Sequence, residues 1–223
     1  MEKNIKLLFL FLFALNLANY SIIAQQTDSK DKLLQKLLDG NKRFIEGKFS
    51  EKDYPAELKE LTKGQHPYAI ILSCSDSRVP PEIIFDESMG KLFVVRVAGN
   101  VLDEVALGSI EYAAEHLHTK LLVILGHSNC GAVNATIAGG EVTPNIEEIV
   151  KKISPAVEKA KKHHPENEVL NCAIKENVIN QVEESLKSSK LLTELNEKGE
   201  LNIVGAMYDI STGKVSILEH HDD

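Results

Sequence analysis

The sequence predicts an α/β fold: a central, mainly parallel β-sheet of four strands with an antiparallel edge strand, flanked by helices and preceded by an N-terminal helical arm. Two observations predict this fold. Four short apolar runs lack polar alternation, as do strands that are covered on both faces. Helical patterns lie between these runs, and strands that alternate with helices form parallel sheets.

Each element has its own signal in the chain. The helical arm is predicted over 31–48, because apolar residues recur there at helical spacing. A second short helix is predicted over 54–61, since Pro55 suits the first turn of a helix. A last segment, Val215–Leu218, follows a turn at Gly213 and is predicted to pair antiparallel with the strand before it, as a hairpin.

The remaining elements are apolar runs of strand length and longer helical patterns. The four predicted strands are Tyr68–Leu72, Leu92–Arg96, Leu121–Leu125 and Leu201–Ala206. The helices predicted between strands are Leu102–Leu117, Ala132–Ala138, Ile146–Lys162 and Val169–Leu186.

Residues 1–24 have the pattern of a secretory signal peptide. A basic start precedes an apolar run over 7–17, and the small Ala24 suits the last position before cleavage. A membrane anchor is the alternative, but Asn16 and Asn19 interrupt the apolar stretch before it reaches the roughly 20 residues that a spanning helix needs. We expect an exported protein, periplasmic or secreted, with no membrane contact after signal removal.

Composition limits the number of domains and the kinds of partner. The chain has 223 residues, of which 43% are apolar, enough to bury the core of the single domain that we expect over 25–223. Its formal net charge is −8. A chain this acidic has no general electrostatic attraction for nucleic acid, so we expect no nucleic-acid partner.

Two polar motifs, each after a predicted strand, suggest one metal site. The first is Cys74-Ser-Asp76-Ser-Arg78 and the second is His127-Ser-Asn-Cys130. Open α/β sheets place their active sites where strands end at their carboxyl edge. Two thiolates and one imidazole suit zinc, and three protein ligands leave a fourth position for water.

Asp76 and Arg78 allow two arrangements of this site. The guanidinium can hold the carboxylate in a bidentate pair, or the carboxylate can bind zinc itself and close the site. A closed structural zinc site is the competing interpretation of the motifs. Structural zinc more often uses C-x-x-C pairs in small domains with little core, so a catalytic zinc is favoured here.

Cys172 falls at an apolar position of a predicted helix. Three cysteines in an exported chain would ordinarily suggest disulfides, but two of them lie in the polar motifs. We therefore expect two metal thiolates and, at Cys172, one buried free thiol.

Four segments together closely resemble the β-class carbonic anhydrases. Two are the metal motifs, over 74–79 and 126–132, and two lie between them, over 93–100 and 108–113. All four occur in the family's order, and the resemblance runs over about 31–217.

The resemblance implies a fold, a cofactor and a reaction. It implies the β-carbonic anhydrase fold, with one Zn²⁺ per subunit bound by Cys74, His127 and Cys130, and by Asp76 only in a closed state. Asp76 and Arg78 would form the catalytic dyad. The reaction would be reversible hydration of carbon dioxide to bicarbonate and a proton, by attack of zinc-bound hydroxide.

The resemblance also implies a substrate pocket at Gln65, Phe93, Ala98 and Tyr112. Family members take the glutamine, phenylalanine and tyrosine from the adjacent subunit. We therefore expect a homodimer, or a tetramer of dimers, and inactive monomers.

Position 71 bears on the subgroup of the family. A bicarbonate-regulated subgroup has tryptophan three residues before the first cysteine, where this chain has Ile71. Gln65 instead resembles the plant-type subgroup. The sequence thus predicts no bicarbonate-locked inactive state.

Two other functions compete with carbon dioxide hydration. Hydrolysis of carbon disulfide or carbonyl sulfide is the nearest one, since relatives with the same zinc site perform it. A zinc-binding protein without activity would be expected to lose the dyad, yet Asp76 and Arg78 are both present.

Overall fold

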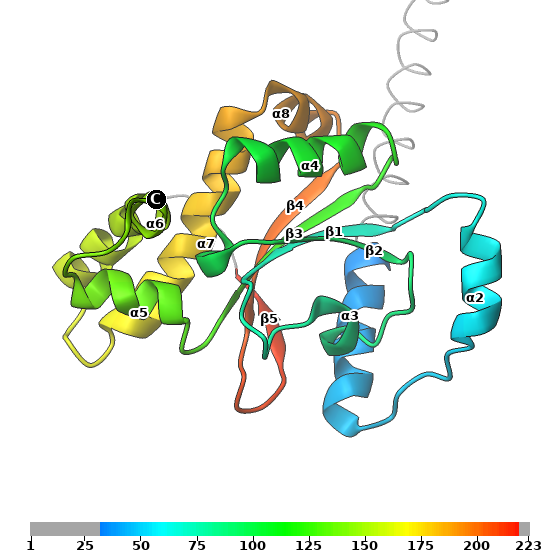
Figure 1. The fold of residues 1–223 in the computed structure, drawn as a ribbon, viewed down its shortest axis with the longest axis horizontal. Helices are drawn as coiled ribbons and strands as arrows, with labels where there is room; N and C mark the ends of the chain where they lie inside the picture. The colour runs from blue at the N-terminus through cyan, green and yellow to red at the C-terminus, as the bar shows by residue number, and fades with distance from the viewer. Residues whose placement is uncertain (1–31, 219–223) are drawn as a thin grey trace, which may run out of the picture.

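The computed structural model describes residues 32–218, which form the α/β fold that the sequence predicts. Five strands make one sheet in the order β2-β1-β3-β4-β5 (Figure 1). All neighbouring strands pair in parallel except β5, which pairs antiparallel with β4 as the predicted hairpin. The predicted signal peptide over 1–24 lies outside the described residues.

Within residues 32–218, no helix is both long enough and apolar enough to cross a bilayer.

The strands lie where the apolar runs predict them. β3 and β4 each extend two residues beyond the predicted carboxyl end, because their pairing continues to His127 and Tyr208. The strands are β1 (Ala69–Ser73), β2 (Leu92–Arg96), β3 (Leu121–His127), β4 (Asn202–Tyr208) and β5 (Val215–Ile217). His127 is therefore the last residue of a strand, with the loop beginning at the residue after it.

The predicted helices are also confirmed, the helical arm as a helix over 32–46. Three shorter elements were not predicted: α3, α8 and the 3₁₀ turn η1 (Ala98–Asn100). α3 and η1 are too short for apolar periodicity to reveal them, whereas α8, with eight residues, is as long as the predicted α2 and was missed. The labelled helices are α2 (Tyr54–Leu61), α3 (Pro81–Ile84), α4 (Glu104–Glu115), α5 (Gly131–Ala138), α6 (Pro144–His163), α7 (Val169–Ser188) and α8 (Lys190–Glu197).

The two faces of the sheet are covered by different helices. Side chains alternate between faces along a strand, so Ile71 and Val123 lie in one core cluster while Ile70 and Leu122 lie in another. The first cluster packs against the helix over 32–46 and α3, and the second against α4, α7 and α8 (Figure 1). A third cluster joins α5, α6 and α7 around the carboxyl end of β1.

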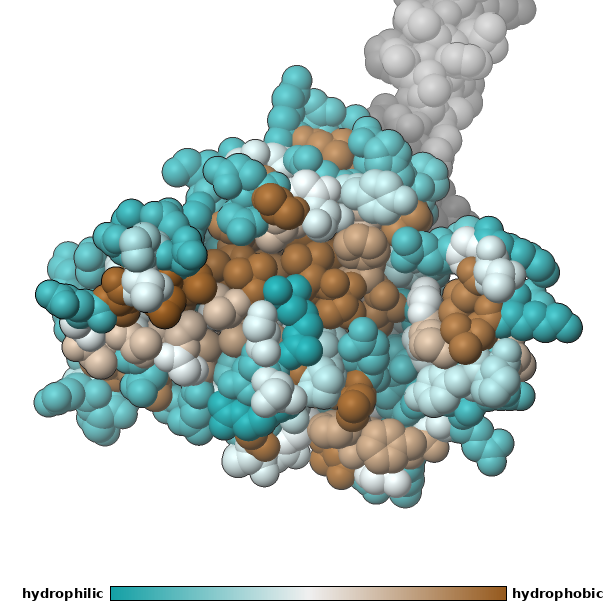
Figure 2. All heavy atoms as spheres, viewed as in Figure 1, coloured by the Kyte–Doolittle hydropathy of each residue, from teal (hydrophilic) through white to brown (hydrophobic). Residues whose placement is uncertain are grey.

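β2 differs from the prediction of strands covered on both faces. It is the edge strand of the sheet, and after its buried first residue its side chains are only partly buried or exposed. An apolar run in the sequence indicates that a strand will be covered. It does not indicate whether the covering element belongs to the same chain or to another one. Figure 2 shows apolar side chains gathered in the middle of the molecular face that lies between α4 and α5.

A buried carboxylate ties the N-terminal arm to the turn that follows α3. Asp86 accepts hydrogen bonds from Arg43 Nε at 2.6 Å and from the backbone N–H and hydroxyl of Ser50 at 3.0 and 2.8 Å, and it pairs with Lys52. Burial alone would raise the pKa of Asp86. The hydrogen bonds from Lys52, Arg43 and Ser50 outweigh burial, so the pKa lies below its usual range.

Replacing Asp86 by alanine should lower the free energy of unfolding by about 1 to 3 kcal/mol, because the partly exposed Arg43 and Lys52 lose a charged hydrogen-bond acceptor. Glu60→Ala, which breaks an exposed pair with Lys63, should cost less than about 1 kcal/mol. Urea unfolding measures both.

Because the folded pKa of Asp86 is depressed, its stabilisation is present above the unfolded pKa of about 3.9 and is lost as pH falls through the folded value. An acid-dependent loss of stability equal to that of wild type in Asp86→Ala would contradict this account.

Candidate metal centre

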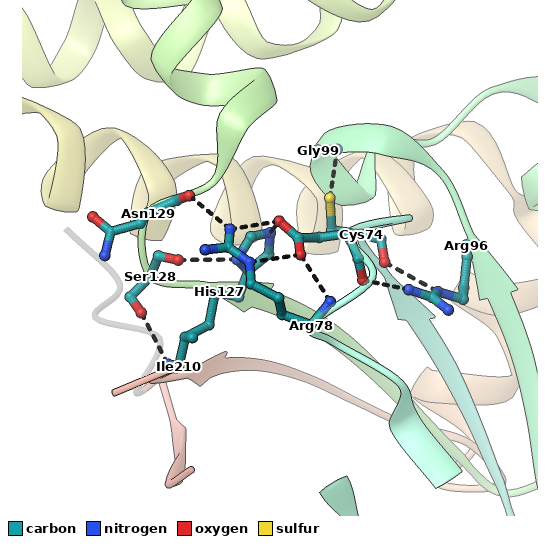
Figure 3. A network of polar contacts seen from close by, with 9 residues as sticks. Cys74, Arg78, Arg96, Gly99, His127, Ser128, Asn129 and Ile210 are labelled. Atoms are coloured by element: carbon teal, nitrogen blue, oxygen red, sulfur yellow. Dashed lines mark hydrogen bonds and ion pairs between the residues drawn. The ribbon is translucent and has the colours of Figure 1, made fainter. Parts of the chain in front are cut away.

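Parallel pairing of β1 with β3 creates the site. Ser73 pairs with Leu125, so Cys74, just past β1, lies beside the end of β3, where His127 is located. Cys130 caps the amino end of α5, three residues farther along. The two sulfurs and an imidazole nitrogen lie within 4.8 Å of one another, and all three residues are buried. The structure thus brings the three predicted ligands together, and Figure 3 shows two of them, Cys74 and His127.

One nitrogen of His127 is free to bind a metal. Its Nδ1 lies 3.0 Å from the carbonyl oxygen of Ser128, which assigns the ring proton to Nδ1. The other nitrogen, Nε2, is buried and has no hydrogen-bond partner. An unsatisfied buried polar atom costs about 1 to 3 kcal/mol, and a metal ion at Nε2 would remove that cost.

The two thiols of the site share one proton. The hydrogen bond from the Cys130 thiol is the largest cause that lowers the pKa of Cys74, to about 4, against the opposing effect of burial. The backbone N–H of Gly99, 3.2 Å from Cys74 Sγ, lowers the pKa further. The pKa of Cys130 is raised in turn, because its proton lies against the Cys74 thiolate. A divalent cation in place of that proton would allow both sulfurs to be thiolates.

The donor set therefore fits zinc. Two sulfurs and one neutral imidazole are ligands that Zn²⁺ prefers, and a three-residue set leaves one tetrahedral position open. The fit depends on the unpartnered Nε2 of His127 and on the shared thiol proton.

Asp76 is held by Arg78. Arg78 donates from Nε to Asp76 Oδ1 at 2.9 Å and from Nη2 to Oδ2 at 2.7 Å, and its backbone N–H also donates to Oδ1 at 2.9 Å. These hydrogen bonds keep the pKa of Asp76 well below its usual range. Oδ2 lies 3.8 Å from His127 Nε2, so the carboxylate borders the three ligand atoms without joining their cluster. Of the two predicted arrangements, the structure has the Arg78-held one.

Arg96 is a functional residue that the sequence reasoning missed. From the end of β2 it donates to the carbonyl oxygens of Cys74 at 3.2 Å and of Asp76 at 2.6 Å (Figure 3). It thereby fixes the backbone that carries a ligand and the dyad carboxylate. An arginine directly after four apolar strand residues was the signal available in the sequence.

Two buried amides of α7 were also missed. Asn177 Nδ2 donates to the carbonyl oxygen of Gly99 at 2.8 Å, and Gln181 Oε1 accepts from the backbone N–H of Leu102 at 2.8 Å. The amides also contact each other at 3.3 Å. They hold the segment over 99–102, in which the N–H of Gly99 donates to Cys74 Sγ. Through this segment, α7 supports the position of Cys74. Their signal is a pair of amides one helical turn apart on a helix face that is otherwise apolar.

Two glycines permit the close packing around the ligands. Gly99 has a φ of 71°, and a Cβ there would lie 2.6 Å from Ile153 Cδ1. Gly126 directly precedes His127, and a Cβ there would lie 2.4 Å from Val178 Cγ2 of α7. A larger residue would force the Ile153 side chain to move at position 99, where the positive φ adds backbone strain, and the Val178 side chain to move at position 126.

The predicted pocket residues are only partly brought together in one chain. Ala98 directly precedes Gly99 and so lies next to the ligands, while the rings of Phe93 and Tyr112 lie 6.3 Å apart on β2 and α4. Gln65 is exposed in the segment before β1, at the amino edge of the sheet, whereas the ligands lie at its carboxyl edge. A single chain therefore does not assemble the complete predicted pocket.

The prediction that Cys172 is buried was wrong. The thiol is free, as predicted, but its residue is only partly buried. It lies in the first turn of α7, where the helix leaves the α6–α7 turn near the surface.

Comparison with known proteins identifies the same family. The family model for carbonic anhydrases matches residues 69–215. Carbonic anhydrase 2 of Mycobacterium tuberculosis is 35% identical over 189 residues, covering 82% of this chain and 90% of that protein.

Solved structures agree. The β-carbonic anhydrase CcaA superimposes with a TM-score of 0.67 at 27% identity, covering 83% of this chain and 95% of that one. A structure described as one of two tetrameric β-carbonic anhydrases from Sordaria macrospora gives 0.68 at 23% identity, covering 92% and 98%, which supports the fold alone.

The family match spans both strands that end at the metal centre and all three candidate ligands. Sequence, fold and site agree, and the chain therefore belongs to the β-class carbonic anhydrases.

Proposed function

We propose that this enzyme catalyses the reversible hydration of carbon dioxide to bicarbonate and a proton, with one Zn²⁺ per subunit held by Cys74, His127 and Cys130. The bidentate hold of Arg78 on Asp76 carries the proposal, because it leaves the fourth position at the three ligands for a reactant. Bound zinc would supply an activated water as nucleophile near neutral pH.

Asp76 would accept a hydrogen bond from the attacking water. Each of its oxygens receives hydrogen bonds from Arg78, and each keeps further acceptor capacity. Oδ2 lies 3.8 Å from His127 Nε2, so it borders the position where the reactant would be. The depressed pKa keeps the carboxylate ionised, and thus an acceptor, throughout the neutral range.

A second subunit would complete the substrate pocket. Ala98 lies at the site of its own chain, while Gln65, Phe93 and Tyr112 would reach the site of a partner. β2 is an edge strand with half-buried apolar side chains, and on α4 Tyr112 is 47% and Val105 78% exposed. We therefore propose a homodimer formed through β2 and α4, or a tetramer of such dimers as in the Sordaria macrospora relative.

Two further features belong to the proposal. The side chain of Ile71 is fully buried in the core cluster next to the helical arm, where it offers no polar group to bicarbonate. We propose that the enzyme has no bicarbonate-locked state, as in the plant-type subgroup. We also propose that residues 1–24 direct export to the periplasm or the exterior and are removed.

Asp76→Asn should keep one zinc per chain, because no ligand changes, while carbon dioxide hydration falls by about 10²- to 10⁴-fold. Stopped-flow hydration assays and zinc analysis measure the two effects, with the exposed Asp39→Asn as matched control. Unchanged turnover would remove Asp76 from its role. Sulfide release from carbon disulfide or carbonyl sulfide by zinc-loaded wild type, without hydration, would favour the alternative hydrolase function.

Asn177→Ala should weaken zinc affinity or activity about 10- to 100-fold, as losses of outer-shell partners of metal ligands do. The reason is the lost hydrogen bond to the Gly99 carbonyl, which positions the N–H that donates to Cys74. Chelator competition and hydration kinetics measure the change. Asn180→Ala, on the same helix, is the control and should change neither; equal effects in both variants would contradict the argument.

Tyr112→Glu should yield monomers without hydration activity, because it places a charge on the proposed interface. Sedimentation velocity measures assembly, and the hydration assay follows in the same samples. Val142→Glu, another substitution of an exposed apolar residue, should leave both unchanged. A fully active monomer would overturn the shared pocket and leave the assigned zinc ligands intact.

A further inference from the structure

A second cluster of metal-ligating side chains lies outside the metal centre, at the turn between α6 and α7. His164 directly follows α6, Glu168 directly precedes α7, and Cys172 lies in the first turn of α7. One ligand atom from each residue lies within 4.8 Å of the other two. Within 32–218, only this trio and the metal centre itself group three such residues so closely.

The backbone presets the positions of the three side chains. The N–H of His164 donates to the carbonyl of Ala160 at 3.0 Å, and the N–H of Glu168 donates to that of Pro165 at 2.9 Å. The N–H of Cys172 in turn donates to the carbonyl of Glu168 at 3.0 Å, which sets these two residues one helical turn apart on one face. Metal binding would therefore require side-chain rotation only.

An ion pair holds the two helices together nearby. Lys159 Nζ of α6 lies 2.7 Å from Glu176 Oε2 of α7, and Glu176 is one turn beyond Cys172 on the same helix. The ion pair thus limits how far the end of α6 can move from the start of α7. His164, which the α6 side contributes, stays in reach of the two α7 residues.

We propose that His164, Glu168 and Cys172 form a second metal site, which takes Zn²⁺ or a similar borderline divalent ion such as Co²⁺. Zinc–ligand lengths of about 2.0 to 2.3 Å place tetrahedral ligand atoms about 3.3 to 3.8 Å apart. The three ligand atoms lie within 4.8 Å of one another, so side-chain rotation has only a short distance to close. Sulfur and imidazole ligands select against Mg²⁺ and Ca²⁺, which prefer oxygen alone.

Exposure distinguishes this site from the catalytic one. His164 and Glu168 are exposed and Cys172 is half-buried, whereas Cys74, His127 and Cys130 are all buried. Water would complete the coordination at the surface, so the second ion should bind more weakly and exchange faster. Binding would link α6 to α7, the helix whose Asn177 supports Gly99.

The test uses the zinc-loaded enzyme, in which the catalytic ligands are occupied. His220 and His221, adjacent histidines near the C-terminus, are first replaced by alanine to remove a competing site. Titration with Co²⁺ should then give one added ion per chain, with a thiolate-to-cobalt charge-transfer band in the near ultraviolet. Cys172→Ser should abolish the band, and His164→Ala should weaken binding at least tenfold.

His163→Ala is the matched control and should bind Co²⁺ as the parent does, since His163 is outside the cluster. Retention of the first zinc verifies that each variant is folded. No added ion in the parent, a band that survives Cys172→Ser, or equal losses in His163→Ala and His164→Ala would each overturn the proposal. The readout is metal binding, so its result is independent of the reaction assigned to the catalytic centre.

Discussion

The parallel pairing of β1 with β3 is the constraint on which the site depends. It places Cys74 and His127, which are distant in the sequence, at one edge of the sheet. α5 then begins within three residues of β3 and brings Cys130 to the same point. Since parallel neighbours end at the same edge, no long-range hydrogen bond between ligands is needed to assemble the set.

Around this edge, the polar groups are arranged for a cation. The Nε2 of His127 is buried without a partner, and the thiols of Cys74 and Cys130 hold one proton between them. Neither condition is favourable in a dry interior, and a divalent ion would relieve both. Arg78 pairs with Asp76 from the solvent side. The carboxylate is therefore held by the guanidinium, next to the candidate ligands but not among them.

The β2 edge of the sheet is less well covered than its central strands. β2 is apolar yet only partly covered, and Gln65 lies at the sheet edge opposite the ligands. Both facts have one explanation in the proposed assembly, in which a partner covers the edge strand and supplies pocket residues. The α6–α7 turn shows a different relation between chemistry and burial: ligand types similar to those of the catalytic centre lie there at the surface, where an ion would exchange with solvent.

The sequence by itself determined the fold class, most element positions and the three candidate ligands that the structure brings together, because apolar runs, helical spacing and motif order are local properties of a chain. Tertiary structure alone decided that Asp76 pairs with Arg78, that β2 is a partly covered edge strand, and that Cys172 is partly exposed. It also revealed the supporting residues, whose partners lie on distant elements: Arg96, Asn177 and Gln181. These features depend on which surfaces pack together. The polarity of a residue indicates whether it favours burial, but not which element of the fold will cover it.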